Sequence, residues 1–189
     1  MATILLAFAQ NVRASLYGDE KLYLLENEIR LVRNFIQIQE YRQPQRIRFE
    51  LNMDPELMHC IIPKLCIQPL LENAVLHGMD GRDKGMVRMC IERNGENLHV
   101  VVEDDGVGIS EQRLETVRSI IYGDARNAEK LLNRSYSALR NVHWRLVLSY
   151  GDIYCLAINS VEGRFTRTEL LLPIQFEVKE VNDSELSDS

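Results

Sequence analysis

Gln68-Pro69-Leu70-Leu71-Glu72-Asn73-Ala74-Val75-Leu76-His77-Gly78 is the most informative part of this chain, because it sets polar side chains into an apolar helix. The helical repeat places Glu72, Asn73 and His77 on or beside one face. A second stretch, Glu103-Asp104-Asp105-Gly106-Val107-Gly108-Ile109, lets a backbone turn approach a ligand beneath a carboxylate. Together the two stretches indicate a ligand site.

The first stretch carries oxygen ligands on an apolar background. An unpaired carboxylate at Glu72 among leucines would cost several kcal/mol, so this residue needs a partner or a use. The carboxylate of Glu72 and the amide oxygen of neighbouring Asn73 are hard ligands that suit Mg²⁺, and a carboxylate can also polarise a hydroxyl. His77, one turn further on, is placed to contact a phosphate. A capping or surface role for Glu72 and Asn73 is the alternative.

The second stretch follows a predicted strand, and its glycines form the turn into the next helix. A buried Asp104 at the strand end can accept a hydrogen bond from an exocyclic amine such as that of adenine. A carbonyl in place of the amine would set two acceptors against each other, so this arrangement predicts specificity for adenine. A lone Gly-x-Gly is weak evidence. Its strength here comes from the pairing with the first stretch.

Apolar periodicity predicts the other elements. Helices are expected over residues 3–16, 19–42, 63–78, 110–122 and 135–150, and strands over 47–51, 86–91, 98–103, 154–159 and 164–172. Asp54-Pro55 is a helix-start signal, and Asn94-Gly95 suits a type I′ turn between two strands. This order predicts an α+β fold, a two-layer α/β sandwich in which helices cover one face of a mixed sheet.

The predicted helix over residues 19–42 has two apolar rows. They are Leu22, Leu25, Ile29, Val32 and Ile36, and Leu24, Leu31, Phe35 and Ile38. One row is expected to pack on the following domain and the other on another helix or a second subunit, although an ordinary core helix fits the periodicity equally well. We therefore expect a helical segment over residues 1–43, a main domain over 44–174 and an acidic, solvated tail over 175–189.

Composition narrows the class of protein. The 189 residues are 46% hydrophobic, which is enough for a sizeable core. The net charge of −6 and the absence of a basic run argue against nucleic acid as a partner. The spacing of Cys60, Cys66, Cys90 and Cys155 matches neither a zinc ribbon nor a small disulfide framework, so we expect reduced thiols in a cytoplasmic chain. The apolar run over residues 4–9 is too short to span a bilayer.

The chain resembles the ATP-binding domain of sensor histidine kinases, within the wider family of Bergerat-fold (GHKL-type) ATPases. The likeness is to the LytS/YehU-type branch and covers about residues 20–173. It is carried by Ile62-Pro63, Leu70-Leu71-Glu72-Asn73-Ala74, His77-Gly78, Asp104-Asp105-Gly106-Val107-Gly108, Leu139-Arg140-Asn141-Val142, Arg145-Leu146 and Tyr150-Gly151.

The resemblance implies that ATP and Mg²⁺ lie between the helices and the sheet, under a flexible lid. It implies that Asn73 binds Mg²⁺, that Glu72 assists phosphoryl transfer and that His77 lies near the phosphates. Asp104 would hold the adenine amine. The nucleotide-binding set would also include Gly106, Gly108, Ile109, Leu139 and Asn141. In such kinases the phosphate passes to a histidine on a separate helical dimerisation segment and then to a response regulator.

Two departures from the family pattern stand out. The second glycine box of the family has glycines where this chain has Tyr136 and Ala138. Glycines there let backbone amides at a helix start cradle phosphates, so side chains at these positions reshape the phosphate pocket. The acceptor-histidine motif is also absent from residues 1–18, and His59, His99 and His143 have the context of surface or packing residues.

The missing acceptor-histidine motif predicts that the chain is a fragment of a longer sensor kinase. Its membrane, sensor and acceptor parts would lie upstream, and the full-length protein would be attached to the membrane and form a homodimer through the N-terminal helices. Two alternatives stay open. One is a degenerate module that binds nucleotide weakly or not at all and acts in conformational signalling. The other is a different Bergerat-fold enzyme, such as an ATPase or a serine kinase.

Overall fold

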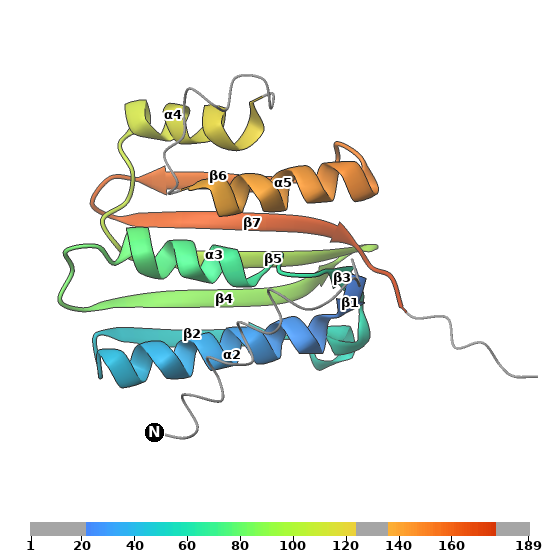
Figure 1. Ribbon diagram of the computed structural model, residues 1–189, viewed down its shortest axis with the longest axis horizontal. Helices are drawn as coiled ribbons and strands as arrows, with labels where there is room; N and C mark the ends of the chain where they lie inside the picture. The colour runs from blue at the N-terminus through green and yellow to red at the C-terminus, as the bar shows by residue number, and fades with distance from the viewer. Residues whose placement is uncertain (1–21, 124–135, 177–189) are drawn as a thin grey trace, which may run out of the picture.

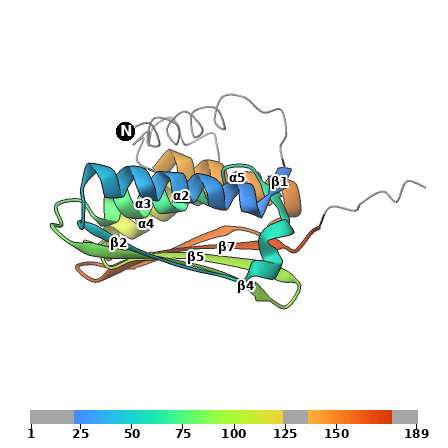
Figure 2. The same cartoon turned by 90° about the horizontal axis from the view of Figure 1, so that it is seen from below.

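The structure, a computed structural model, describes residues 22–123 and 136–176. One layer is a five-stranded sheet of β2 (Ile47–Met53), β4 (Gly85–Asn94), β5 (Asn97–Asp104), β7 (Phe165–Pro173) and β6 (Leu156–Val161), in that spatial order. β2 pairs with β4 in parallel and the other pairs are antiparallel. Helices lie on one face of this sheet (Figure 2). The predicted two-layer sandwich with a mixed sheet is therefore confirmed.

The second layer is helical (Figure 1). It contains α2 (Leu25–Arg42), α3 (Gln68–Asn73) with its π-helical continuation η2 (Ala74–Gly78), α4 (Glu111–Tyr122) and α5 (Ser137–Tyr150). A short 3-10 helix, η1 (Pro55–His59), follows β2, and the Asp54 carboxylate accepts a hydrogen bond from the backbone N–H of Glu56 at 2.9 Å. The helix-start signal at Asp54-Pro55 is thus confirmed.

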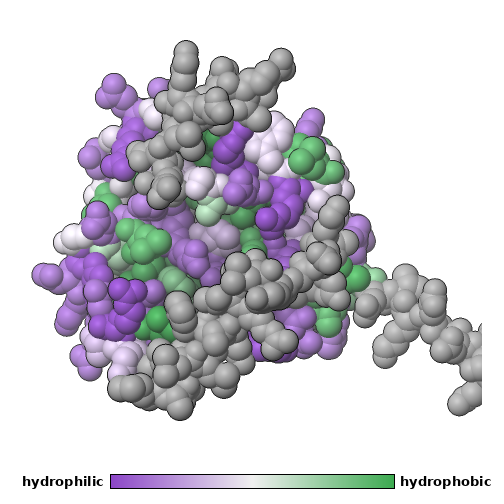
Figure 3. All heavy atoms as spheres, viewed as in Figure 1, coloured by the Kyte–Doolittle hydropathy of each residue, from purple (hydrophilic) through white to green (hydrophobic). Residues whose placement is uncertain are grey.

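The hydrophobic core lies between the sheet and the helices. Alternate residues of β4, namely Val87, Met89 and Ile91, are about 1% exposed, and buried side chains of α2 join the same core. Hydrophobic side chains on the helical face appear as patches among hydrophilic ones (Figure 3). Because α2 and the sheet share one core, their packing shows no domain boundary at residue 44. The predicted domain limits 1–43, 44–174 and 175–189 stay predictions.

The helix predicted to begin at Asp19 begins instead at Leu25. Residues Leu22–Leu24 form a strand, β1, which pairs antiparallel with β3 (Ile61–Pro63). The backbone N–H of Leu25 then donates to Cys60 O at 2.8 Å. Pairing with a distant strand overrides the helical periodicity here, as local sequence cannot anticipate. The helix expected over residues 3–16 lies outside the described residues.

The helix predicted over residues 63–78 begins at Gln68, because residues 64–67 form a turn in which Leu65 has a φ of 56°. The carboxylate of Glu28, from α2, holds this turn. It accepts hydrogen bonds from the backbone N–H groups of Leu65 at 2.6 Å and Ile67 at 2.8 Å. On the other side, the Arg145 guanidinium donates to Lys64 O. The start of α3 is therefore fixed from both α2 and α5.

One smaller prediction, the type I′ turn, needs correction. Asn94 pairs with Asn97, so the turn residues are Gly95 and Glu96, and Gly95 alone of the four has a positive φ, of 61°. A type I′ turn needs two positive φ angles, which excludes it at Asn94-Gly95. In the tail predicted over residues 175–189, the structure describes Gln175 and Phe176, both of which are exposed, and Gln175 O accepts from the Ile61 N–H at 2.7 Å. Residues 177–189 lie outside the described residues.

Replacing Glu28 by glutamine is expected to destabilise the fold by about 2 kcal/mol or more, because a side-chain NH₂ group would then face buried N–H donors. Glu28 is fully buried. Urea unfolding measures the change, and Glu40→Gln, at an exposed position of the same helix, is the matched control. Equal stability of the two variants would show that Glu28 does not hold the 64–67 turn.

Candidate functional site

The α3–η2 segment carries two buried amide oxygens that have no hydrogen-bond partner among the described residues, Gln68 Oε1 and Asn73 Oδ1. Asn73 is 7% exposed, and its Oδ1 atom has no hydrogen-bond partner among the described residues. Glu72, its neighbour, is half-buried, and its carboxylate accepts from Gln68 Nε2 at 2.6 Å. A buried amide oxygen without a donor is costly unless a ligand supplies one or a cation binds it. Of Gln68 and Asn73, only Asn73 lines a cavity, so Asn73 is the residue of this pair that a ligand can reach.

Asp104 ends β5 directly beneath η2. Its side chain is 1% exposed, and the backbone N–H groups of Gly106 and Thr166 donate to it. A methyl group on Gly78 would lie 2.3 Å from its Oδ1 atom, which shows how closely η2 covers the carboxylate. Burial raises the pKa of Asp104 from 3.8 to about 7, with Asp105 and Glu103 adding to the rise and the two N–H groups opposing it.

The turn after Asp104 is tied to both neighbouring elements. The Val107 N–H donates to Gly78 O at 2.8 Å, and the Ile109 N–H donates to Ser160 Oγ at 2.8 Å. Gly108 has a φ of 61°, a conformation that favours glycine. The glycine turn predicted from the sequence therefore runs directly against η2, which brings the two informative stretches together.

A cavity of about 190 Å³ opens where these segments meet. It is lined by Asn73, His77, Gly78, Asp80, Val107, Gly108, Ile109, Arg113, Tyr136 and Thr166. Of the predicted site residues, Asn73, His77, Gly108 and Ile109 line it, and Asp104 and Gly106 lie against its wall through Gly78 and Thr166.

Three predicted site residues lie away from this cavity wall. Glu72 turns to Gln68, Leu139 is a buried core residue at 1% exposure, and Asn141 is exposed. Sequence reasoning missed Asp80, Arg113 and Thr166 as lining residues. Thr166 reaches the site because it pairs directly with Asp104 across β5 and β7, a long-range register that the sequence does not report.

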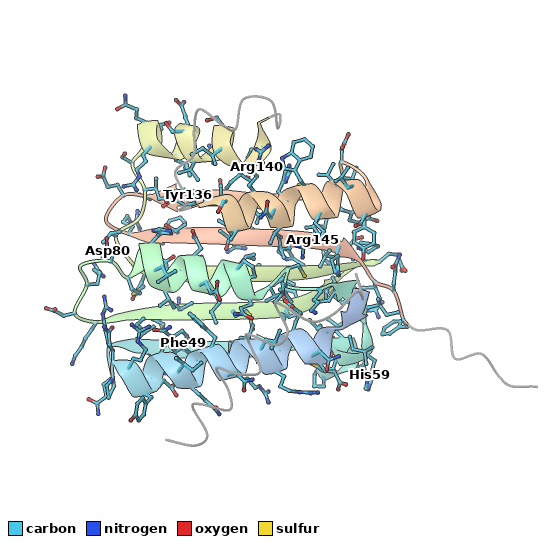
Figure 4. The ribbon with its side chains drawn as sticks, in the orientation of Figure 1. Phe49, His59, Asp80, Tyr136, Arg140 and Arg145 are labelled. Atoms are coloured by element: carbon cyan, nitrogen blue, oxygen red, sulfur yellow. The ribbon has the colours of Figure 1, made fainter. Side chains whose placement is uncertain are left out.

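Tyr136 lines the cavity at the start of α5. It stands at the N-cap of α5, is 3% exposed, and its ring centroid lies 5.2 Å from that of His77 with a tilt of 31°. Figure 4 shows Tyr136 at the end of α5 that faces the end of α3 nearer Asp80. Burial raises the pKa of Tyr136, and the Arg113 charge opposes that rise. The predicted departure from glycine thus lies inside the cavity, whereas Ala138 is exposed.

Over residues 22–123 and 136–176, no group of three or more histidine, cysteine, aspartate or glutamate side chains could hold a metal ion. A hard cation here would need Asn73 together with oxygen atoms from a ligand. Mg²⁺ commonly binds nucleotides in this way, through one or two protein oxygens plus phosphates. The donor set therefore fits a cation that arrives with a phosphate ligand.

Residues 61–175 match the model of the histidine kinase-, DNA gyrase B- and HSP90-like ATPase family. The chain belongs to this family. It is 29% identical to sensor histidine kinase YesM of Bacillus subtilis over 88% of this chain and 26% of that protein. It is also 29% identical to sensor protein kinase HptS of Staphylococcus aureus over 91% of this chain and 32% of that protein. The chain thus spans a quarter to a third of the length of these relatives.

A solved relative supports the fold. The histidine kinase domain of the EL346 blue-light activated kinase from Erythrobacter litoralis aligns with a TM-score of 0.51 at 18% identity, covering 92% of this chain and 74% of that one. The predicted resemblance to the ATP-binding catalytic domain of sensor histidine kinases is confirmed by these comparisons. No helix in the described part of this ATPase-family chain is long and apolar enough to cross a membrane.

The ligand-free domain is expected to lose stability as the pH rises from about 4 to 8. An acid whose pKa is higher in the folded state, like Asp104, binds more protons folded than unfolded, so unfolding is favoured between 3.8 and about 7. The full effect is at most on the order of 4 kcal/mol. Urea unfolding at several pH values measures it. The Asp104→Asn variant should lack the part of the pH dependence of stability that comes from Asp104. An unchanged pH dependence in this variant would contradict the assignment of the raised pKa to Asp104.

Proposed function

We propose that the cavity binds ATP with Mg²⁺, and that the domain transfers the γ-phosphate to a histidine outside this chain. The observation that carries the proposal is the orphaned Oδ1 atom of Asn73, a residue that lines the same cavity as Gly108 and Gly78. Buried Asp104 lies directly against Gly78. Membership in an ATPase family supports ATP as the ligand, and the geometry of the cavity suggests which residues hold it.

Asp104 and Thr166 are the proposed adenine contacts. Ionised Asp104 would accept a hydrogen bond from the adenine amine while it keeps those from Gly106 and Thr166. Gly108 and Ile109 line the cavity, and glycine at 108 lets the turn pack against Val161, where a Cβ would lie 2.1 Å from Val161 O. A base with a carbonyl at this position would set one acceptor against the Asp104 carboxylate, which is another acceptor. The site would therefore discriminate against such a base.

Asn73, His77 and Arg113 are the proposed contacts of the metal and the phosphates. Asn73 Oδ1 would bind Mg²⁺, and His77 and Arg113 line the cavity beside it. Mg²⁺, when bound, neutralises charge on the phosphates, and the protein positions them for in-line transfer. Glu72 would assist transfer only after releasing Gln68, and contacts of Leu139 and Asn141 with nucleotide stay predictions.

The wider setting is also proposed. YesM and HptS are sensor kinases that extend well beyond the matched region. By analogy, the full-length protein would be attached to a membrane with this domain in the cytoplasm, dimerise through helices before α2, and pass its phosphate to a response regulator.

A second function is favoured by Tyr136. The cavity of about 190 Å³ is smaller than the roughly 300–1,000 Å³ of typical small-molecule sites. A degenerate module that signals without nucleotide would have such a small cavity. This interpretation and the kinase interpretation differ in whether ATP binds at all.

Phosphotransfer tests the proposal. The chain is mixed with ATP carrying labelled γ-phosphate, Mg²⁺ and a helical segment that bears the acceptor histidine of a sensor kinase. We expect acid-labile phosphate on the segment, and none when Asn73→Ala replaces the wild-type chain. Label that appears only as inorganic phosphate would identify an ATPase instead, and no turnover with no bound nucleotide would favour the module.

A further inference from the structure

The Tyr136 side chain lies in the region where the phosphates of the proposed nucleotide would bind. The cavity is lined by Tyr136 together with His77 and Asn73, the residues proposed to face the phosphates and metal. The ring is 3% exposed and packs against the His77 ring. Where α5 begins, the wall of the cavity is therefore formed by an aromatic side chain.

This location is the start of a helix of 14 residues, Ser137–Tyr150. The first backbone N–H groups of a helix have no partner within it and attract anions. Tyr136 is the N-cap of α5, yet its side chain makes no capping hydrogen bond. The ring thus contributes no cap to α5, and it lies between the helix start and the wall formed by η2, as its contact with His77 shows.

We propose that Tyr136 is a gate that sets nucleotide affinity: its ring excludes phosphates from the start of α5, and ATP binds only to molecules in which the ring has left the cavity. The proposal rests on the proposed nucleotide site. Observed affinity is then the intrinsic affinity reduced by the fraction of molecules with an open cavity. A domain gated in this way has a low resting affinity that any event freeing the ring would raise.

The gate predicts a gain of function on truncation. Tyr136→Gly and Tyr136→Ser should bind an ATP analogue with Mg²⁺ about tenfold tighter or more, because the open fraction no longer limits binding. Both replacements suit an N-cap, and serine can add the capping bond that tyrosine lacks, so α5 is preserved. Tyr136→Phe keeps the ring and should retain the low affinity of the wild type. Isothermal titration measures all four proteins.

Tyr150→Ser is the matched control. It removes a partly buried tyrosine from the opposite end of α5, where the ring meets Tyr154 rather than the cavity. It should leave the dissociation constant within about threefold of wild type. Circular dichroism confirms that each variant is folded before titration, and the serine variant substitutes for the glycine variant if the latter unfolds.

The outcomes separate the gate from the site. Tighter binding by both truncations supports the gate. Binding by the wild type with equal or weaker binding by both truncations overturns the gate, because the ring would then support the nucleotide, and leaves the nucleotide site standing. No binding by the wild type and by either folded truncation overturns the nucleotide site and the gate with it.

Discussion

Asp104→Asn is expected to weaken binding of an ATP analogue by about a hundredfold or more. Asp104 already accepts hydrogen bonds from the backbone N–H groups of Gly106 and Thr166, so the adenine amine needs a further acceptor on the same carboxylate. Asparagine offers one oxygen and one NH₂ group. In either orientation the NH₂ group would face a donor, which is costly where the side chain is buried.

Titration of folded protein at pH 8, where Asp104 is ionised, measures the loss of affinity. Asp83→Asn is the control, because it removes one carboxylate from an exposed position outside the cavity lining. Its dissociation constant should stay within about threefold of wild type. If Asp104→Asn binds as tightly as the control, the base is held elsewhere and the proposed orientation of ATP is wrong.

Gly106→Ala is expected to destabilise the domain by about 3 kcal/mol or more, because it overpacks a backbone contact. An added Cβ would lie 1.9 Å from Gly78 O and 2.6 Å from the Asp104 carboxylate. Relief requires η2 and the glycine turn to move apart, and these segments carry His77 and Gly108. The variant should therefore also bind nucleotide poorly wherever it remains folded.

Gly163→Ala provides the comparison for Gly106→Ala. Gly163 has a φ of 71°, but a methyl group added there would meet open space. The substitution by alanine should therefore cost only the backbone strain of a positive φ, about 1 kcal/mol of stability. Urea unfolding should rank Gly106→Ala below Gly163→Ala in stability. The reverse ranking would mean that the turn and η2 are less tightly packed than the structure indicates.

Much of the architecture could be predicted from local pattern. Alternating apolar residues located the strands of the sheet within a few residues, because one face of each strand is buried and the other is not. The glycine turn and Asn73 were identified from residue chemistry alone. The glycine turn and the polar residue Asn73 are both features that a short segment of sequence encodes by itself.

The errors share a cause, which is contact between distant segments. β1 exists because β3 offers it a partner, and α3 starts late because Glu28 reaches across from α2. Arg113 and Thr166 line the cavity because of how α4 and β7 pack against the other elements. The apolar periodicity of a single segment does not predict this packing. The sequence shows that Tyr136 departs from the glycine of the family, but its ring contact with His77 joins residues nearly 60 positions apart and no local pattern predicts it.

Parallel titrations of the wild-type chain with ATP and with inosine triphosphate, in Mg²⁺ at pH 8 and up to millimolar ligand, test the central assignment most directly. The two nucleotides differ in the group that would meet Asp104, an amine in one and a carbonyl in the other. We expect ATP to bind at least about tenfold more tightly. Equal affinity for both nucleotides, or no binding of either, would contradict an adenine site at Asp104.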